Sequence, residues 1–180
     1  VSALFSSGVG LLKLVADPLR QLPEITFWLL GGLFGIGWKQ VLGLLPVVVP
    51  ALAGILLLRW RLNVLSLSDE TAFALGVAVR RERALLLLLS VAATAAVVSV
   101  SGMVGWVGLI TPHVARRLHG ADARRALPGA MLLGAIVVVA CDDLARTLVA
   151  AEIPLGIVTS LVGAAAFAVV MIRPPVRGRA

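Results

Sequence analysis

Long apolar stretches alternate with short charged ones along this chain. Charge-free runs cover Gln40–Leu58, Ala84–Ala115, Ala126–Cys141 and Ile153–Ile172. A helix of about 20 residues crosses the ~30 Å hydrocarbon core of a bilayer. The runs lack the strict two-residue alternation of barrel strands. Because backbone polar groups in lipid must be satisfied within the protein, the runs predict transmembrane α-helices.

The run 84–115 is too short for two full spans and is interrupted near its middle. Its helix breakers are Gly102, Gly105, Gly108 and Pro112. They predict a first helix that ends near Val104 and a short or tilted second helix from Trp106 to Leu118. A single span with a re-entrant piece is the alternative. The fold class is therefore all-α: a polytopic membrane protein with about five full transmembrane helices. We expect a partial helix at the N-terminus and one domain over residues 1–180, truncated N-terminally.

Two shorter segments lie between the spans. The apolar piece Ile25–Phe34 is too short to cross a bilayer and predicts a periplasmic interfacial or pore-mouth helix. Between Arg61 and Arg80, Ser68 is a good N-cap, with acidic residues directly after it, and Gly76 is a helix terminator. This predicts a short amphipathic helix, which is either a surface connector or a docking element for a cytosolic partner.

Composition and charge agree with a membrane location. Hydrophobic residues make up 60% of the chain and charged ones 14%, whereas a soluble domain has about 45–50% and about 25%. The net charge of +7 comes largely from three clusters between the apolar runs. These are Arg59, Arg61, Arg80, Arg81 and Arg83; Arg116, Arg117, Arg124 and Arg125; and Arg173, Arg177 and Arg179. Basic loops stay on the cytoplasmic side. Because the basic residues are placed in these loops, as the positive-inside rule expects, we expect no nucleic-acid partner.

The polar residues within the spans are few. Asp142, Asp143 and Arg146 lie together, and Asp142 can pair with Arg146 across one helical turn. This pair either fixes helix rotation or lets Arg146 receive an acidic partner at the outer surface. We expect the His113 side chain to pack within the protein and the His119 side chain to be solvated. The pattern shows no metal site, no nucleophile with its base and no phosphate-binding glycine loop. If transport needs ATP, another subunit must bind it.

The residues carry a family resemblance. Leu62–Val77, read Leu-Asn-Val-Leu-Ser-Leu-Ser-Asp-Glu-Thr-Ala-Phe-Ala-Leu-Gly-Val, resembles the Leu-Asn-x-Leu-x-Leu-Gly-Glu-x-x-Ala-x-x-Leu-Gly signature of the FecCD permeases. Gly102–Arg116 is similar to that family's Gly-x-Ile-Gly-Phe-Val-Gly-Leu-x-x-Pro-His-x-x-Arg. Leu118–Pro128, Asp142–Arg146 and Ile153–Gly163 complete five ordered blocks. The departures are few: Ser68 replaces a usual Gly, Ala123 a common His, and Ala164–Ala166 the usual Ala-Pro-Phe.

The resemblance implies an importer permease with ten spans, of which this chain would supply the end of the fifth through the tenth. Residues 66–83 would form paired cytoplasmic coupling helices seated in a cleft of an ABC ATPase subunit, which would bind ATP and Mg. The coupling residues implied are Ser66, Leu67, Ser68, Asp69, Glu70, Ala72, Phe73, Leu75, Gly76 and Val77. A periplasmic or lipoprotein binding protein would dock at Arg146, Glu152, Arg20 and Glu24. Phe27, Trp28, Gly31, Gly32 and Phe34 would line the path, next to a second permease copy.

The resemblance also sets the expected location and cargo. The chain would sit in membrane lipid, in the cell (inner) membrane, as a non-enzymatic transport subunit with no cofactor or metal of its own. Its cargo would be an iron-siderophore, haem or cobalamin-type chelate. Two alternatives stay open: the same family importing a molybdate or tungstate oxyanion, and a secondary transporter that needs no ATPase. The second requires functional charges near the bilayer midplane, and only the Asp142, Asp143 and Arg146 group is available.

Overall fold

The computed structural model describes residues 1–148 and 153–172, and every regular element in that part of the chain is a helix. The elements are α1 (Ser2–Val15), α2 (Gln21–Leu30), α3 (Trp38–Leu57), α4 (Arg59–Leu65), α5 (Asp69–Ala74), α6 (Val79–Ser101), α7 (Val107–His119), α8 (Ala123–Thr147) and α9 (Leu155–Ile172). The expected all-α class is confirmed.

Among the described residues, three helices are long and apolar enough to cross a membrane. They are α3, α6 and α8, with mean hydropathies of 2.2, 2.3 and 1.8 over their most apolar windows. Helix α1 and the stretch Leu155–Ala168 of α9 are apolar but shorter, and α7 has 13 residues. A multi-pass helical protein is therefore confirmed, whereas the number of five full spans stays a prediction.

The break expected inside the run 84–115 is present. Helix α6 ends at Ser101 rather than at Val104, because Gly102 adopts a positive φ of 66° that stops the helix. Trp106 also has a φ of 66°, which is unusual for a residue with a side chain, and α7 begins directly after it. The two helices thus form as separate elements, as the glycines predict.

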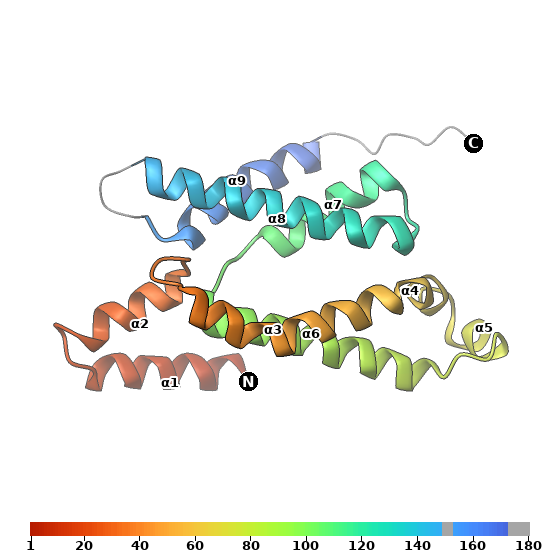
Figure 1. The fold of residues 1–180 in the computed structure, drawn as a ribbon, viewed down its shortest axis with the longest axis horizontal. Helices are drawn as coiled ribbons and strands as arrows, with labels where there is room; N and C mark the ends of the chain where they lie inside the picture. The colour runs from red at the N-terminus through yellow and green to blue at the C-terminus, as the bar shows by residue number, and fades with distance from the viewer. Residues whose placement is uncertain (149–152, 173–180) are drawn as a thin grey trace.

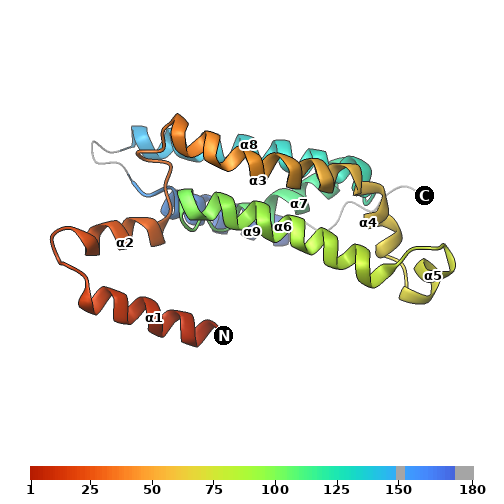
Figure 2. The ribbon, with the colours of Figure 1, turned by 60° about the horizontal axis from the view of Figure 1, so that its bottom comes forward.

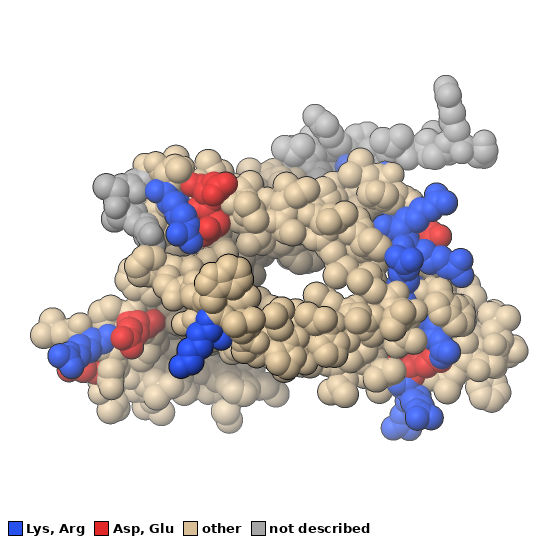
Figure 3. Space-filling model, viewed as in Figure 1, with Lys and Arg blue, Asp and Glu red and all other residues tan. Residues whose placement is uncertain are grey.

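The long helices form two layers (Figures 1 and 2). One layer pairs α3 with α6, and the other packs α7, α8 and α9 together. In the described residues the layers meet at their two ends, where α2 contacts α9 and α4 contacts α8. Between these ends the space-filling view shows an opening (Figure 3). A small buried cluster of Cys141, Ala145, Leu155 and Val158 joins α8 to α9.

Three glycines bring the layers together near α2. We call Gly31, Gly102 and Gly156 the glycine junction. A Cβ on Gly31 would overlap the carbonyl of Met103, one on Gly102 the carbonyl of Trp28, and one on Gly156 the carbonyl of Leu30. The Gly32 amide donates to the Ser101 carbonyl at 2.8 Å, and the Gly156 amide to the Gly31 carbonyl at 3.3 Å. The ends of α2 and α6 and the start of α9 therefore meet backbone against backbone.

Helix α3 is continuous although it contains Pro46 and Pro50. Proline has no amide hydrogen, so neither residue can donate the helical bond to the carbonyl four residues earlier. The carbonyls concerned are those of Leu42 and Pro46, and both of these residues are exposed.

Candidate functional site

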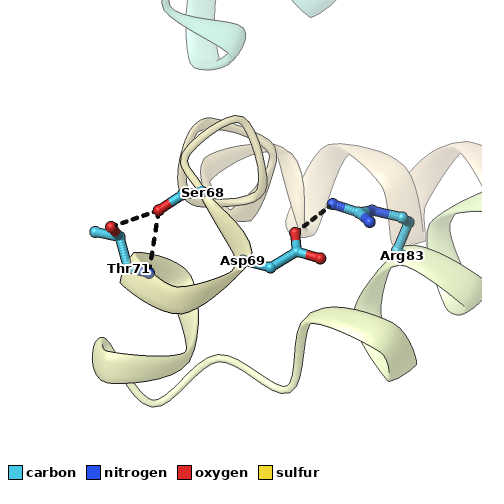
Figure 4. Close-up of polar contacts among 4 residues, drawn as sticks. All are labelled: Ser68, Asp69, Thr71 and Arg83. Carbon is cyan, nitrogen blue, oxygen red and sulfur yellow. Dashed lines mark hydrogen bonds and ion pairs between the residues drawn. The ribbon is translucent and has the colours of Figure 1, made fainter.

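The segment 66–83 projects from the end of the molecule where α4 meets α5 (Figure 1). Its short helix α5 begins as predicted: the Thr71 amide donates to the Ser68 hydroxyl at 3.3 Å, and the two hydroxyls lie 2.7 Å apart (Figure 4). Asp69 and Glu70 occupy the first turn, where the helix dipole favours negative charge. Ser68 is thus confirmed as the N-cap.

Helix α5 ends in a Schellman motif. Gly76 has a φ of 78°, its amide donates to the Phe73 carbonyl at 2.9 Å, and the Val77 amide donates to the Ala72 carbonyl at 3.1 Å. Ala72 and Val77 are both buried, like the hydrophobic pair that usually accompanies this motif. A helix of only six residues is therefore fixed at both ends.

The rest of the segment differs from a pair of separate short helices. From Val79 onward the chain is already the first turn of α6, which runs without a break into the apolar span. Arg80, Arg81, Glu82 and Arg83 are good helix formers, and no glycine or proline separates them from Ala84. One short helix and the start of a long one thus make up residues 66–83.

The segment exposes most of its predicted coupling residues. Phe73 is 78% exposed, and Leu67, Leu75 and the polar residues of α5 also face outward. Ala72 and Val77 do not, since they lie inside the Schellman turn. The exposed apolar surface therefore centres on Phe73 and Leu75. A surface depression of about 960 Å³ beside it is lined by Phe73 and by three arginines, Arg80, Arg81 and Arg83.

Two ion pairs attach this region to α6. Arg83 Nη2 lies 3.1 Å from Asp69 Oδ1, with both side chains largely exposed (Figure 4). Arg61 of α4 pairs with Glu82 of α6, whose side chain is only 13% exposed. Arg61 also lies over the Trp60 ring, with its guanidinium carbon 5.0 Å from the ring centroid. Among the described residues, Arg61 Nε and Glu82 Oε2 are buried without a hydrogen-bond partner.

A third polar contact joins α4 to the start of α8. Asn63 Nδ2 donates to Asp122 Oδ1 at 2.7 Å, and the Ala123 amide donates to Asn63 Oδ1 at 2.8 Å. Asp122 is the N-cap of α8 and also accepts from the Arg124 amide at 2.9 Å. The hydrogen bond from Asn63, followed by the one from the Arg124 backbone, lowers the pKa of Asp122 below its usual value.

The predicted docking residues lie at the opposite end of the molecule. Arg146 Nε donates to Asp142 Oδ2 at 2.8 Å, which confirms the expected pair, and the Arg146 side chain stays 45% exposed. Arg20 and Glu24 are exposed at the start of α2. Glu152 lies outside the described residues. The space-filling view shows charged side chains at both ends of the molecule, and most of those at the end near α4 are basic (Figure 3).

The predicted path residues divide into two kinds. Phe27 and Phe34 are exposed, as is Trp28, whose indole donates to the Ser99 carbonyl at 3.4 Å. Gly31 is buried within the glycine junction, and the Gly32 amide is bonded to α6. The two glycines therefore hold the end of α2 against the end of α6, whereas the side chains of the three aromatic residues are exposed.

Comparison with known families shows which family this chain belongs to. A family model described as the FecCD transport family matches residues 1–173. The chain belongs to the FecCD transport family.

Two curated relatives of this FecCD chain have different cargoes in their names. It is 42% identical over 171 residues to the molybdate import system permease protein of Haemophilus influenzae, covering 95% of the chain and 51% of that protein. It is also 42% identical over 174 residues to the hemin transport system permease protein of Yersinia pestis, covering 96% and 52%. The chain spans about half the length of these relatives.

A solved structure has the same fold. It is described as an inward-facing conformation of a transporter assigned to the metal-chelate ABC type. It shares 42% identity with this FecCD chain at a TM-score of 0.91, over 94% of the chain and 55% of the solved one. Together with the three membrane-length helices, the family membership makes this a multi-pass protein of the inner membrane.

The structure shows a contact between two of the FecCD sequence blocks that was not predicted from the sequence. Asn63 belongs to the Leu62–Val77 block and Asp122 to the Leu118–Pro128 block, and the structure joins them. The available signals were an asparagine close before the short helix α5 and an aspartate at the N-cap of an apolar helix. Neither signal predicts that these two residues pair with each other. No group of three potential metal ligands gathers in residues 1–148 and 153–172.

Proposed function

We propose that this chain is part of the permease of an ABC importer, in which a separate ATPase subunit hydrolyses ATP and pushes on residues 66–83. The observation that carries the proposal is the capped helix α5, which with its C-cap residue presents Phe73 and Leu75 beside three arginines at the basic end of the molecule. An apolar side chain on a rigid, short helix suits insertion into a cleft of a soluble partner. The basic loops would place this end in the cytosol.

The opposite end would receive the substrate-binding protein. Arg146, Arg20 and Glu24 are exposed there, and the Arg146 side chain is 45% exposed beside Asp142. Surface arginines recognise carboxylates through paired hydrogen bonds, so an acidic patch on the binding protein would fit Arg146. Glu152, outside the described residues, belongs to the same proposal.

We propose that Phe27, Trp28 and Phe34 present the path surface, with Gly31 and Gly32 holding them in place through the glycine junction. The second permease copy would face them across the path. Residues 1–180 form part of a single transmembrane permease domain in this scheme, with residues 66–83 as its coupling segment.

The cargo we propose is an iron-siderophore, haem or cobalamin-type chelate delivered by the binding protein. The hemin permease of Yersinia pestis supports this class. A molybdate or tungstate oxyanion is the second candidate, because the molybdate permease of Haemophilus influenzae is equally similar at 42% identity. Isolating the cognate binding protein from cells and identifying its ligand by mass spectrometry separates the two: a chelate supports the first candidate, and an oxyanion supports the second.

The proposed coupling is tested by binding of the ATPase. Phe73→Asp and Leu75→Asp place a charge on the exposed face of α5, and we expect each to abolish co-purification of the ATPase with the permease. Leu19→Asp is the matched control, since Leu19 is an exposed leucine before α2, at the other end of the molecule. Gly76→Pro, which cannot adopt the positive φ of the Schellman turn, should also release the ATPase. Full binding by all three coupling variants would refute the proposal.

A further inference from the structure

Helix α4 contacts both layers of the molecule through two residues on nearly opposite sides. Arg61 pairs with Glu82 of α6, and Asn63 bonds to Asp122 and Ala123 at the start of α8. Residues two apart in an α-helix are separated by about 200° around the axis. One helix of seven residues therefore joins the α3–α6 layer to the α7–α9 layer.

The Asn63 contact uses both ends of the amide side chain. Nδ2 donates to the carboxylate of Asp122, and Oδ1 accepts from the Ala123 amide, one of the N-terminal amides of α8 that have no partner within their own helix. Asp122 in turn caps α8 through the Arg124 amide. We call the group of Asn63, Asp122 and Ala123 the α4–α8 latch.

The latch lies directly beside the coupling segment. Helix α4 ends at Leu65, and the Ser66 hydroxyl donates to the Asn63 carbonyl at 2.7 Å. Ser68, two residues further on, is already the N-cap of α5. A displacement of α5 therefore reaches Asn63 over only a few residues, and the latch connects that residue to a helix of membrane length.

From this we infer that Asn63 is a positioning residue for coupling: it holds α4 against the N-terminus of α8, so that movement of the coupling segment is passed to the α7–α9 layer. The inference rests on the proposed function and adds a residue pair to it. Arg61 and Glu82 serve the α6 side of the same helix. On the α8 side, the latch connects α4 to α8 through side-chain hydrogen bonds.

The pairing chemistry gives a test by exchange of the two residues. Asn63→Asp sets two carboxylates against each other and removes the donor. Asp122→Asn keeps an acceptor oxygen for the Asn63 amide. In the double variant, the new amide at position 122 can donate to the new carboxylate at position 63, which still accepts from Ala123. The oxygen of the new amide then has to turn toward the Arg124 amide, because Asp122 Oδ1 accepts from both Asn63 and Arg124 in the wild type. We therefore expect a defect in Asn63→Asp, little change in Asp122→Asn, and rescue in the double variant.

The experiment uses the full-length permease with its ATPase and binding protein in proteoliposomes. The measured quantity is the amount of cargo transported per ATP hydrolysed, with ATPase co-purification measured in parallel. For Asn63→Asp and Asn63→Ala we expect co-purification within twofold of wild type and transport per ATP lower by about tenfold, the size of effect that one lost charge-assisted bond gives. The double variant should recover at least part of the transport per ATP that Asn63→Asp loses.

Four results would count against this role. Unchanged transport per ATP in Asn63→Asp and Asn63→Ala overturns it, as does a defect that the double variant does not rescue. Loss of the assembled complex in both Asn63→Asp and Asn63→Ala would show that Asn63 is needed for folding, and it would overturn the positioning role as well. A wild-type permease that binds no ATPase refutes the proposed function itself, and this is established before any variant is compared.

Discussion

The guanidinium of Arg61 and the carboxylate of Glu82 form an ion pair between α4 and the first turn of α6, and the Glu82 side chain is almost fully enclosed. The neighbouring pair of Arg83 and Asp69 has the same chemistry but lies in the open, with the Asp69 side chain 70% exposed. The two pairs lie on consecutive residues of α6. The stability contributions of a nearly buried and an exposed ion pair can therefore be compared at almost the same place in the molecule.

Glu82→Gln should destabilise the protein by about 1–3 kcal/mol, because it removes the counter-ion of Arg61 at a position where the Glu82 side chain is only 13% exposed. Asp69→Asn removes the exposed pair and should cost no more than about 1 kcal/mol. The measurement is the unfolding midpoint of both variants in detergent. Equal midpoints for the two variants would contradict the role of burial.

Gly31→Ala should destabilise the protein more than Gly35→Ala. Both glycines have nearly the same positive φ, 71° and 72°, so an alanine strains the backbone at either position. A Cβ at Gly35 meets nothing within 4 Å, whereas one at Gly31 would overlap the Met103 carbonyl. We expect a further loss of about 1–3 kcal/mol at Gly31. Thermal unfolding of the two alanine variants measures it, and indistinguishable curves would argue against the glycine junction.

Ser68→Ala should loosen α5 by about 1 kcal/mol, since the hydroxyl that accepts from the Thr71 amide is lost. Faster amide hydrogen exchange in residues 69–75 would report the loosening directly. Ser68→Asn is the control, because asparagine also caps helices well and should keep wild-type exchange. Fast exchange in wild type itself would show that α5 is not held by its cap.

Arg146→Glu should weaken the complex with the binding protein by at least about tenfold, because a like charge would then face the acidic partner. The control is Arg125→Glu, which makes the same charge change on an exposed arginine at the opposite end of the molecule. Titration of binding protein onto reconstituted permease gives both dissociation constants. The difference should shrink as salt is added. A similar loss in both variants would indicate a general charge effect instead of docking.

The α4–α8 latch should show a defined dependence on pH. The Asn63 amide lowers the pKa of Asp122 below its unfolded value of 3.8, so its contribution to stability is present above that pH and is lost as pH falls through the folded pKa. The difference in unfolding midpoint between wild type and Asn63→Ala should therefore be constant near neutral pH and shrink below pH 3.8. A difference that does not change between neutral pH and that range would contradict the charge-assisted part of the contact.

The sequence predicts the elements well where the signal is local. Apolar runs of membrane length became α3, α6 and α8, since length and composition alone determine whether a helix can lie in lipid. The cap at Ser68 and the turn at Gly76 were predictable because each depends on residues within one turn. The end of α6 at Ser101 differed by less than one turn from the expected Val104, as helix ends often do.

Features that depend on distant residues could not be predicted in the same way. Asn63 and Asp122 are 59 positions apart, and neither has an apolar period or spacing that points to the other. The burial of Ala72 and Val77 likewise depends on how the chain folds back after α5, which an amphipathic pattern does not specify. The separate helix α4 was also missed, because no glycine or proline marks the bend at Leu58.

The two prolines of α3 have a consequence for what surrounds that helix in the bilayer. The carbonyl oxygens of Leu42 and Pro46 each lack the amide that would normally bond to them, and they follow one another on the same side of the helix. Hydrocarbon offers no donor, so an acyl chain is a poor neighbour for that side. We therefore expect this strip of α3 to face water or a hydroxyl-bearing helix, with the lipid tails lying along its other sides.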